Sequence, residues 1–150
     1  MSACDILVIA NLNMDLILEQ KNSQQTSRKR YADSFTLSPG GNGYNEAVAA
    51  ARMGATVALA GMIGSDSFGA QLKASLNEEI TDSQLVRVVP GSSGLSLILS
   101  SAGQENIYWD IVGANACLDE EYIRGLESHI AKVKLLVVGF GVPYASTVLA

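Results

Sequence analysis

A glycine-rich loop that runs directly into a helical segment constrains the fold of this sequence more than any other feature. Residues 39–47 read Pro-Gly-Gly-Asn-Gly-Tyr-Asn-Glu-Ala, and an Ala-rich stretch continues to Gly54. Glycine permits positive φ and lets a ligand approach bare backbone, while the first turn of a helix offers unpaired N–H groups and a partial positive charge. The loop therefore predicts either a binding site for a polar ligand or a tight turn at a helix start.

Two common glycine-rich phosphate loops do not fit these residues. A dinucleotide fingerprint counted from Gly41 requires a third glycine where Glu46 stands, and its carboxylate would face a pyrophosphate. A Walker loop requires a Lys-Ser or Lys-Thr pair, which the sequence lacks. A sugar site remains, because Asn45 on the first helical turn can both donate and accept hydrogen bonds with hydroxyls.

The segments around the loop predict a βαβ unit of a parallel sheet. Residues 5–10 and 56–60 are short apolar runs typical of strands buried on both faces, and the helix after the loop connects them. Residues 31–38 alternate in polarity and predict a half-buried strand. The polar residues 20–30 between these segments predict a loop.

The rest of the sequence continues the alternation of strands and helices. Residues 61–69 predict a turn, and Ser65 or Asp66 can cap the helix that follows. That helix is predicted because Phe68, Leu72, Leu76 and Ile80 recur at a spacing of four. Further strands are predicted at residues 85–89, 94–100, 107–112 and 135–138, a hairpin turn at 102–106, a helix at 119–130 and the start of another helix at Pro143.

Composition excludes several classes of protein. The 150 residues are 48% hydrophobic and 17% charged, which is typical of one globular domain. A net charge of −5 argues against nucleic acid as a partner, and no apolar run approaches the ~20 residues that span a membrane. With two cysteines and one histidine, His129, which we expect at the surface, we predict no metal site and a cytoplasmic location.

Asn13 and Asp15 are the first candidates for ligand contact. They follow the first predicted strand, and ligands bind at the carboxyl ends of strands in α/β sheets. Side chains two residues apart on extended backbone point the same way, so this pair can bind adjacent hydroxyls of a polyol. Each hydrogen bond to the carboxylate contributes ~1.5 to 3 kcal/mol. The alternative is that Asp15 caps a turn.

Four segments taken in order resemble the PfkB family of carbohydrate kinases, also called the ribokinase family. They are Asn13-Met-Asp15, the loop at 39–45, the Gly-x-x-Gly-x-Asp-x-Phe-Gly at 61–69, and the Gly-Ala-Asn that begins at Gly113. The resemblance extends from Asp5 to about Pro143. It implies an α/β fold, a partial ribokinase-like three-layer α/β/α arrangement, with a small β-sheet lid formed by about 16–38 and 94–112.

The resemblance also implies a function. Family members transfer a phosphoryl group from ATP, with Mg²⁺, to a sugar hydroxyl, and lid sheets pair two subunits into a homodimer. The catalytic aspartate belongs to a Gly-Ala-Gly-Asp motif of the nucleotide-binding half, which these 150 residues lack. The chain is therefore expected to be an N-terminal, sugar-binding half that is inactive alone and contains no catalytic residue. The implied sugar-binding residues are Asn13, Asp15, Gly40, Gly41, Asn42 and Asn45.

Three departures from the family pattern support a competing interpretation. Asn42 stands where the pattern has lysine, Gly141 stands where an acidic residue is expected, and residues 24–30 replace a Pro-x-x-Gly-Glu segment. The alternative is a catalytically incompetent sugar-binding or interaction module. A generic nucleotide-binding domain is disfavoured by the missing phosphate loop. Buried parallel strands without neighbours on one side would expose an apolar edge, which predicts self-association of the isolated chain.

Overall fold

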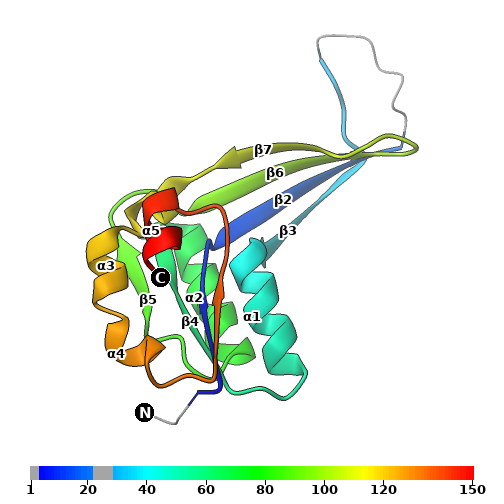
Figure 1. Cartoon of the computed structure of the whole chain (residues 1–150). Helices are drawn as coiled ribbons and strands as arrows, with labels where there is room; N and C mark the ends of the chain where they lie inside the picture. The colour runs from blue at the N-terminus through cyan, green and yellow to red at the C-terminus, as the bar shows by residue number, and fades with distance from the viewer. Residues whose placement is uncertain (1–3, 22–28) are drawn as a thin grey trace.

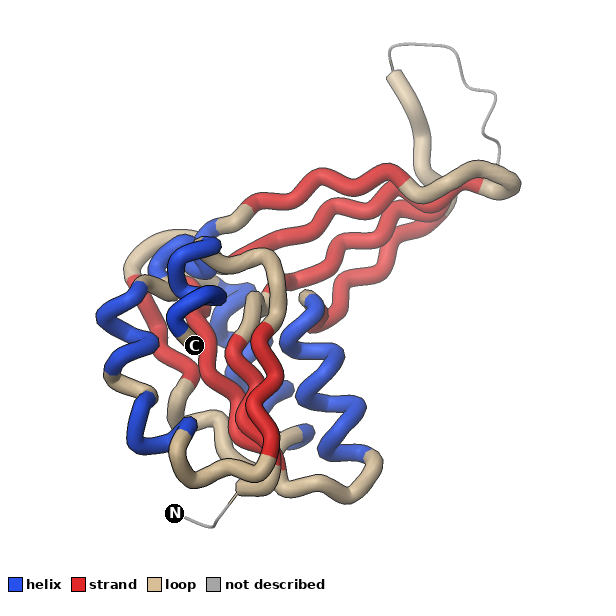
Figure 2. The backbone as a smooth tube through the Cα atoms, viewed as in Figure 1, coloured by secondary structure: helices blue, strands red, loops and turns tan. Residues whose placement is uncertain are grey.

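The computed structural model describes residues 4–21 and 29–150, which form two four-stranded sheets. One sheet, with strand order β5-β4-β1-β8, is the centre of a body flanked by helices. The other, with order β3-β2-β6-β7, projects from this body as a lid (Figures 1 and 2). Most of the predicted polar loop, residues 22–28, lies outside the described residues.

The body sheet is entirely parallel within the described chain. Its strands are β1 (Ile6–Ile9), β4 (Val57–Gly64), β5 (Val86–Val89) and β8 (Leu135–Val138). The prediction of a turn beginning at Gly61 was wrong, because β4 continues to Gly64. Gly61 pairs with Val86 of β5, and this pairing extends the strand by four residues.

Helices cover both faces of the body sheet. On one face, α1 (Asn42–Arg52) and α2 (Ser67–Glu79) pack against β1 and β4 through a core that includes Leu59 and Leu72. On the other, α3 (Glu120–Arg124), α4 (Glu127–Ile130) and α5 (Tyr144–Leu149) follow the short 3₁₀ helix η1 (Gly113–Cys117). The three-layer α/β/α arrangement is confirmed.

The prediction of one continuous helix over residues 119–130 was wrong, because the segment forms two short helices, α3 and α4. Asp119 caps α3 by accepting a hydrogen bond from the N–H of Tyr122, as an acidic residue at a helix start does. The chain then breaks at Gly125 and Leu126 before α4 begins. Glycine disfavours a helix interior, which accounts for a break at Gly125, and Leu126 is buried with Tyr122 and Ile123 in the core on this face of the sheet.

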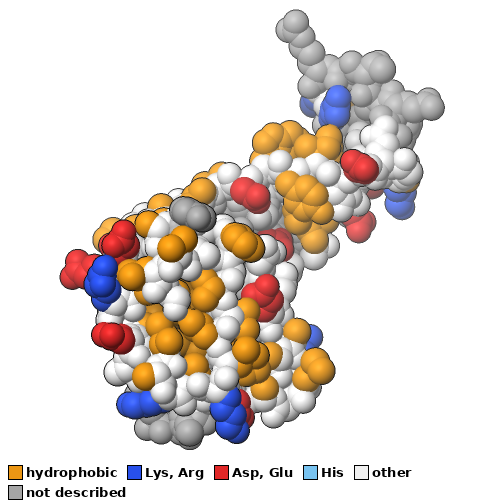
Figure 3. All heavy atoms as spheres, viewed as in Figure 1, with side chains coloured by type: hydrophobic (Ala, Val, Ile, Leu, Met, Phe, Trp, Pro, Cys, Tyr) orange, Lys and Arg blue, Asp and Glu red, His pale blue; other side chains and the backbone are white. Residues whose placement is uncertain are grey.

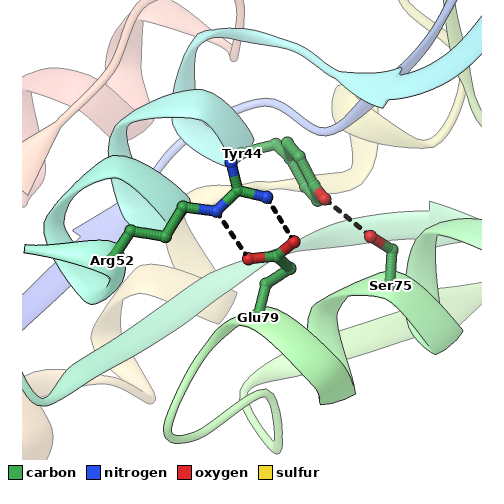
Figure 4. Close-up of polar contacts among 4 residues, drawn as sticks. All are labelled: Tyr44, Arg52, Ser75 and Glu79. Carbon is green, nitrogen blue, oxygen red and sulfur yellow. Dashed lines mark hydrogen bonds and ion pairs between the residues drawn. The ribbon is translucent and has the colours of Figure 1, made fainter.

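Two polar contacts hold α1 against α2 (Figure 4). Arg52 donates from its Nε to one oxygen of Glu79 at 2.9 Å and from a terminal nitrogen to the other at 2.5 Å. The hydroxyl groups of Tyr44 and Ser75 lie 2.6 Å apart. These contacts link the two helices at the surface, above the core that packs α1 on the sheet, and the first turn of α1 carries the glycine-rich loop. No helix among the described residues is both long and apolar enough to cross a membrane.

The lid combines parallel and antiparallel pairing. Its strands are β2 (Asn13–Gln20), β3 (Ser34–Gly40), β6 (Gly94–Ser101) and β7 (Ile107–Ile111); β2 pairs parallel with β6 and antiparallel with β3, and β6 pairs antiparallel with β7. The strand predicted at residues 31–38 corresponds to β3, which begins three residues later, after Asp33 accepts a hydrogen bond on its carboxylate from the N–H of Lys21, and ends two residues later. The sequence did not predict β2 as a strand.

Alternation along the lid strands separates a polar face from an apolar one. Asp15, Ser96 and Asp110 lie opposite one another across β2, β6 and β7 and share one face. Their sequence neighbours occupy the other face, where Trp109 is 53% and Phe35 69% exposed. Figure 3 shows hydrophobic side chains gathered on the lid as well as on the body near β8.

Candidate functional site

A cavity of about 540 Å³ lies at the junction of lid and body. The lid strands β2, β6 and β7 provide one wall, and the first turn of α1 provides another. Residues after β1 and β8, including Asn11 and Gly141, close the end formed by the body. The cavity therefore opens at the carboxyl ends of the parallel strands, where ligands of α/β sheets bind.

Five of the six predicted sugar-binding residues line this cavity. They come from two elements that are well separated in sequence, β2 and the start of α1: Asn13, Asp15, Gly41, Asn42 and Asn45. The sixth, Gly40, is not part of the lining. A Cβ atom at Gly40 would lie 2.1 Å from Oδ2 of Asp15, so the absence of a side chain there makes room for the carboxylate.

The carboxylate of Asp15 is held in an unusual state. Its Oδ1 atom is buried and accepts no hydrogen bond from the described residues. Burial raises the pKa of Asp15 above its ordinary value, the neighbouring charge of Asp110 raises it further, and a hydrogen bond from the backbone of Gly41 opposes both. An unpaired buried oxygen is costly, so a ligand hydroxyl that donates to Oδ1 would relieve that cost.

A chain of directed hydrogen bonds crosses the polar face of the lid. Asn115 donates from Nδ2 to Oδ1 of Asn13 at 2.9 Å, and Asn13 donates from its own Nδ2 to Ser96 at 3.1 Å. Ser96 in turn donates to Oδ1 of Asp110 at 2.6 Å. Because every donor points the same way, the amide of Asn13 has a fixed orientation at the cavity wall.

Asn115 anchors this chain to the body. Its Oδ1 accepts from the N–H of Leu12 at 2.9 Å, while its Nδ2 also reaches the carbonyls of Leu12 and Val112. The side chain is almost completely buried, with 1% of its surface exposed. Asn115 thus ties η1 to the start of β2, where the chain passes from body to lid.

Gly41 shapes the loop where it meets the cavity. Its φ of +88° lies in the region that only glycine adopts readily. A Cβ atom there would lie 2.9 Å from the nitrogen of Asn13 and 3.0 Å from the carbonyl oxygen of Asn11. The loop therefore packs directly on the segment between β1 and β2, which brings Asn42 and Asn45 to the same cavity as Asp15.

Sequence reasoning missed Ser96, Asp110 and Asn115 as residues of the site. Asn115 belongs to a segment that had been singled out, although no role followed from it. Ser96 and Asp110 line the wall because of their register with Asp15, and local sequence patterns do not reveal how distant strands pair.

His129 was expected at the surface. It is half-buried, and its buried Nδ1 atom has no hydrogen-bond partner in the described chain.

The charges of the cavity do not suit a nucleotide. Asp15 and Asp110 are its charged lining residues, and no Lys, Arg or His belongs to the described lining. Within residues 4–21 and 29–150, no group of three His, Cys, Asp or Glu side chains could hold a metal ion. Among the described residues, this lining therefore offers no positive group for the phosphates of a nucleotide, whereas its two carboxylates and several amides fit the hydroxyls of a sugar.

Comparison with known proteins decides the family. Residues 4–148 match the pfkB family of carbohydrate kinases. The chain belongs to this family. It is 30% identical to the ribokinase of Haemophilus influenzae, covering 97% of this chain and 48% of that protein, and 31% identical to the deoxyribokinase of Salmonella typhi over 89% and 44%. The chain spans about half the length of the curated relatives it matches.

Solved structures of the family show the same fold. The ribokinase of Giardia lamblia superposes with a TM-score of 0.86 at 25% identity, covering 97% of this chain and 48% of that one. An Arabidopsis thaliana ribokinase, solved with ribose and ATP, has a TM-score of 0.80 at 17% identity, which supports the fold alone. The ribokinase-like α/β fold expected from the sequence is confirmed.

Proposed function

We propose that this chain supplies the sugar-binding half of an ATP-dependent carbohydrate kinase. The observation that carries the proposal is the convergence of Asn13 and Asp15 with the loop at Gly41 on one cavity. Its lining among the described residues includes carboxylates and amides but no Lys, Arg or His. Membership of the pfkB family supports phosphorylation of a sugar as the reaction.

In this proposal Asp15 is the main anchor of the sugar. Its unpaired Oδ1 accepts a hydrogen bond from one hydroxyl, and the oriented amide of Asn13 serves an adjacent one. Asn42 and Asn45, at the start of α1, donate from the opposite wall. Together these groups hold the sugar in one orientation, which is the main contribution that binding residues make to phosphoryl transfer.

Pentoses are the first substrates to test. Relatives of this chain are named ribokinase and deoxyribokinase, so D-ribose and 2-deoxy-D-ribose are the proposed sugars. ATP supplies the phosphoryl group when it is bound, and a related fungal ribokinase was solved with ADP. No step of that transfer is assigned to the residues present here.

We also propose that the apolar face of the lid pairs with a second copy of the chain. Trp109 and Phe35 expose more than half of their surface there, and Leu37 and Ile107 are exposed beside them. Lone apolar residues are common on protein surfaces, but a continuous apolar sheet face is typical of an interface. Replacing Trp109 by threonine should weaken self-association in sedimentation without changing the polar face.

The competing function is a module that binds a sugar or a partner without catalysis. Gly141 favours it, since this position lines the cavity and offers no acidic group there. A Cβ atom at this position would lie 2.9 Å from the side-chain nitrogen Nδ2 of Asn11, so an acidic residue could replace Gly141 only if the side chain of Asn11 moved.

Calorimetry and a coupled ADP assay on the full-length protein separate the two functions. Binding of D-ribose or 2-deoxy-D-ribose together with sugar-dependent ADP release supports the kinase, whereas binding without ADP release supports the module. Absence of both would refute the sugar site itself. Asp15→Asn should weaken binding by about ten- to a hundredfold. Glu105→Gln, which removes the same charge from the exposed turn between β6 and β7, should leave binding unchanged.

A further inference from the structure

A second carboxylate faces the cavity beside the one already assigned to the sugar. Asp15 pairs in register with Ser96, and Ser96 pairs with Asp110, so the two aspartates lie two strands apart on the same face of the lid. At the usual strand spacing their Cα atoms are roughly 10 Å apart, a separation that one sugar ring with its hydroxyls can bridge. Both residues line the cavity.

Asp110 is held in place by the hydrogen-bond chain. The Ser96 hydroxyl donates its single proton to Oδ1 of Asp110 at 2.6 Å, and its oxygen is occupied by the amide of Asn13. A carboxylate is a strong acceptor for a serine hydroxyl, so this contact holds the side chain of Asp110 against the lid. One oxygen is thereby fixed on the lid, and the carboxylate stays at the cavity wall.

Among the residues that the structure describes, no positive side chain at this wall compensates the two aspartates. Asn42, at the position where the family pattern has lysine, brings an amide instead of a cation to the cavity. Repulsion between the two carboxylates also contributes to the raised pKa of Asp15, for which burial is the larger cause and the charge of Asp110 the smaller one. A ligand that enters this cavity therefore meets two negative groups and no cation among the described lining residues.

We propose that Asp110 is a specificity-determining residue that ranks sugars by charge, with ammonium-bearing sugars bound above neutral ones and phosphorylated sugars last. The inference rests on the proposed function, because it concerns the same sugar cavity. Neutral sugars keep two good acceptors for their hydroxyls, an ammonium group gains a charge-assisted hydrogen bond, and a phosphate is repelled by both carboxylates.

Calorimetry with three related pentoses tests the ranking on the full-length protein. D-ribose is the reference, 2-amino-2-deoxy-D-ribose carries the ammonium group at a pH where its amine is protonated, and D-ribose 5-phosphate carries the anion. We expect the wild-type protein to bind the amino sugar roughly tenfold more tightly than ribose, and ribose roughly tenfold more tightly than its phosphate. Both ratios should shrink with added salt, since screening weakens charge interactions.

Asp110→Asn is the decisive variant, because asparagine can still accept the hydrogen bond from Ser96 but carries no charge. Each ratio should fall to about threefold or less in this variant. Glu105→Gln, which changes the net charge equally at the exposed β6–β7 turn, should leave both ratios at the wild-type values. A steric penalty on the phosphate would be the same in wild type and variant, so only a charge effect changes the ratio.

The outcomes separate this inference from the proposed function. If D-ribose binds and the ratios are identical in wild type and Asp110→Asn, the role of Asp110 is refuted while the sugar site stands. If neutral and charged pentoses all fail to bind the wild-type protein, the sugar site and the ranking are refuted together. A change of the ratios that appears equally in Glu105→Gln would assign the effect to net charge and also overturn the role of Asp110.

Discussion

Strands β4 and β7 show how differently the two sheets of this molecule use their residues. All eight residues of β4 are buried, and all five of β7 are exposed. Helices cover both faces of the body sheet, so β4 is apolar or glycine throughout, whereas β7 alternates Trp109 on one face with Tyr108 and Asp110 on the other. The body thus contains most of the buried core, and the lid supplies a wall of the cavity.

The largest effect on stability is expected in the body. Leu59 is fully buried at the centre of β4, whereas Leu97 on the apolar lid face is half-exposed. Leu59→Ala should lower the free energy of unfolding by about 2 to 5 kcal/mol because it leaves a cavity in the core, and Leu97→Ala should lower it by less than half as much. Denaturant titration of the full-length protein measures both. Equal losses would contradict the division of roles between body and lid.

Replacement of Gly41 should disturb the junction of the two regions. Alanine there must adopt a φ of +88° and push against the backbone of Asn11 and Asn13, so we expect a destabilisation of roughly 1 to 3 kcal/mol and at least about tenfold weaker sugar binding. Gly54→Ala is the matched control. Gly54 also has positive φ, at +94°, but a Cβ atom there meets nothing within 4 Å. Calorimetry should find the sugar affinity of Gly54→Ala unchanged. An equal loss of affinity in both variants would contradict the role given to the close packing of Gly41 on Asn11 and Asn13.

Asp15→Asn should separate binding from stability. Loss of the carboxylate should weaken sugar binding by about ten- to a hundredfold. Because the pKa of Asp15 is raised above its ordinary value of 3.8, the folded protein holds this proton more tightly than the unfolded chain, and wild-type stability falls as the pH rises from about 3.8. Asp15→Asn has no carboxyl group to titrate at this position, so its stability does not fall with pH for this reason.

The pH dependence of unfolding checks that sign. Relative to wild type, Asp15→Asn should be more stable at neutral pH than it is at a pH below 3.8, where the wild-type carboxyl is protonated in both states. Thermal unfolding across that range measures the difference. A variant that loses relative stability as the pH rises would show that the carboxylate stabilises the free protein.

The smallest effect is expected at the contact between α1 and α2. Arg52 and Glu79 form a bidentate ion pair, but the arginine side chain is 68% exposed, so water and salt screen the attraction. Glu79→Gln should change the melting temperature little and leave sugar affinity unaltered. A large drop would mean that this surface pair, and not the core beneath it, positions the first turn of α1.

In the body, local patterns predicted which segments form strands and helices better than they predicted where those elements end. The continuous apolar runs at β1 and β8 and the capped start of α2 at Asp66 could be recognised because burial on both faces and helix capping leave marks within a few residues. The extension of β4 through Gly61 could not, since it depends on the pairing of Gly61 with Val86 of β5.

The sequence by itself determined the general alternation of strands and helices, the family, and the two segments that carry Asn13, Asp15 and the loop at Gly41, but it did not predict β2 as a strand. Tertiary structure alone decided that these segments share a cavity with Ser96, Asp110 and Asn115. The physical reason is that periodicity, capping and glycine conformation act between near neighbours in the chain. The register of β2 with β6 and of β6 with β7, by contrast, is set by packing between residues far apart in sequence.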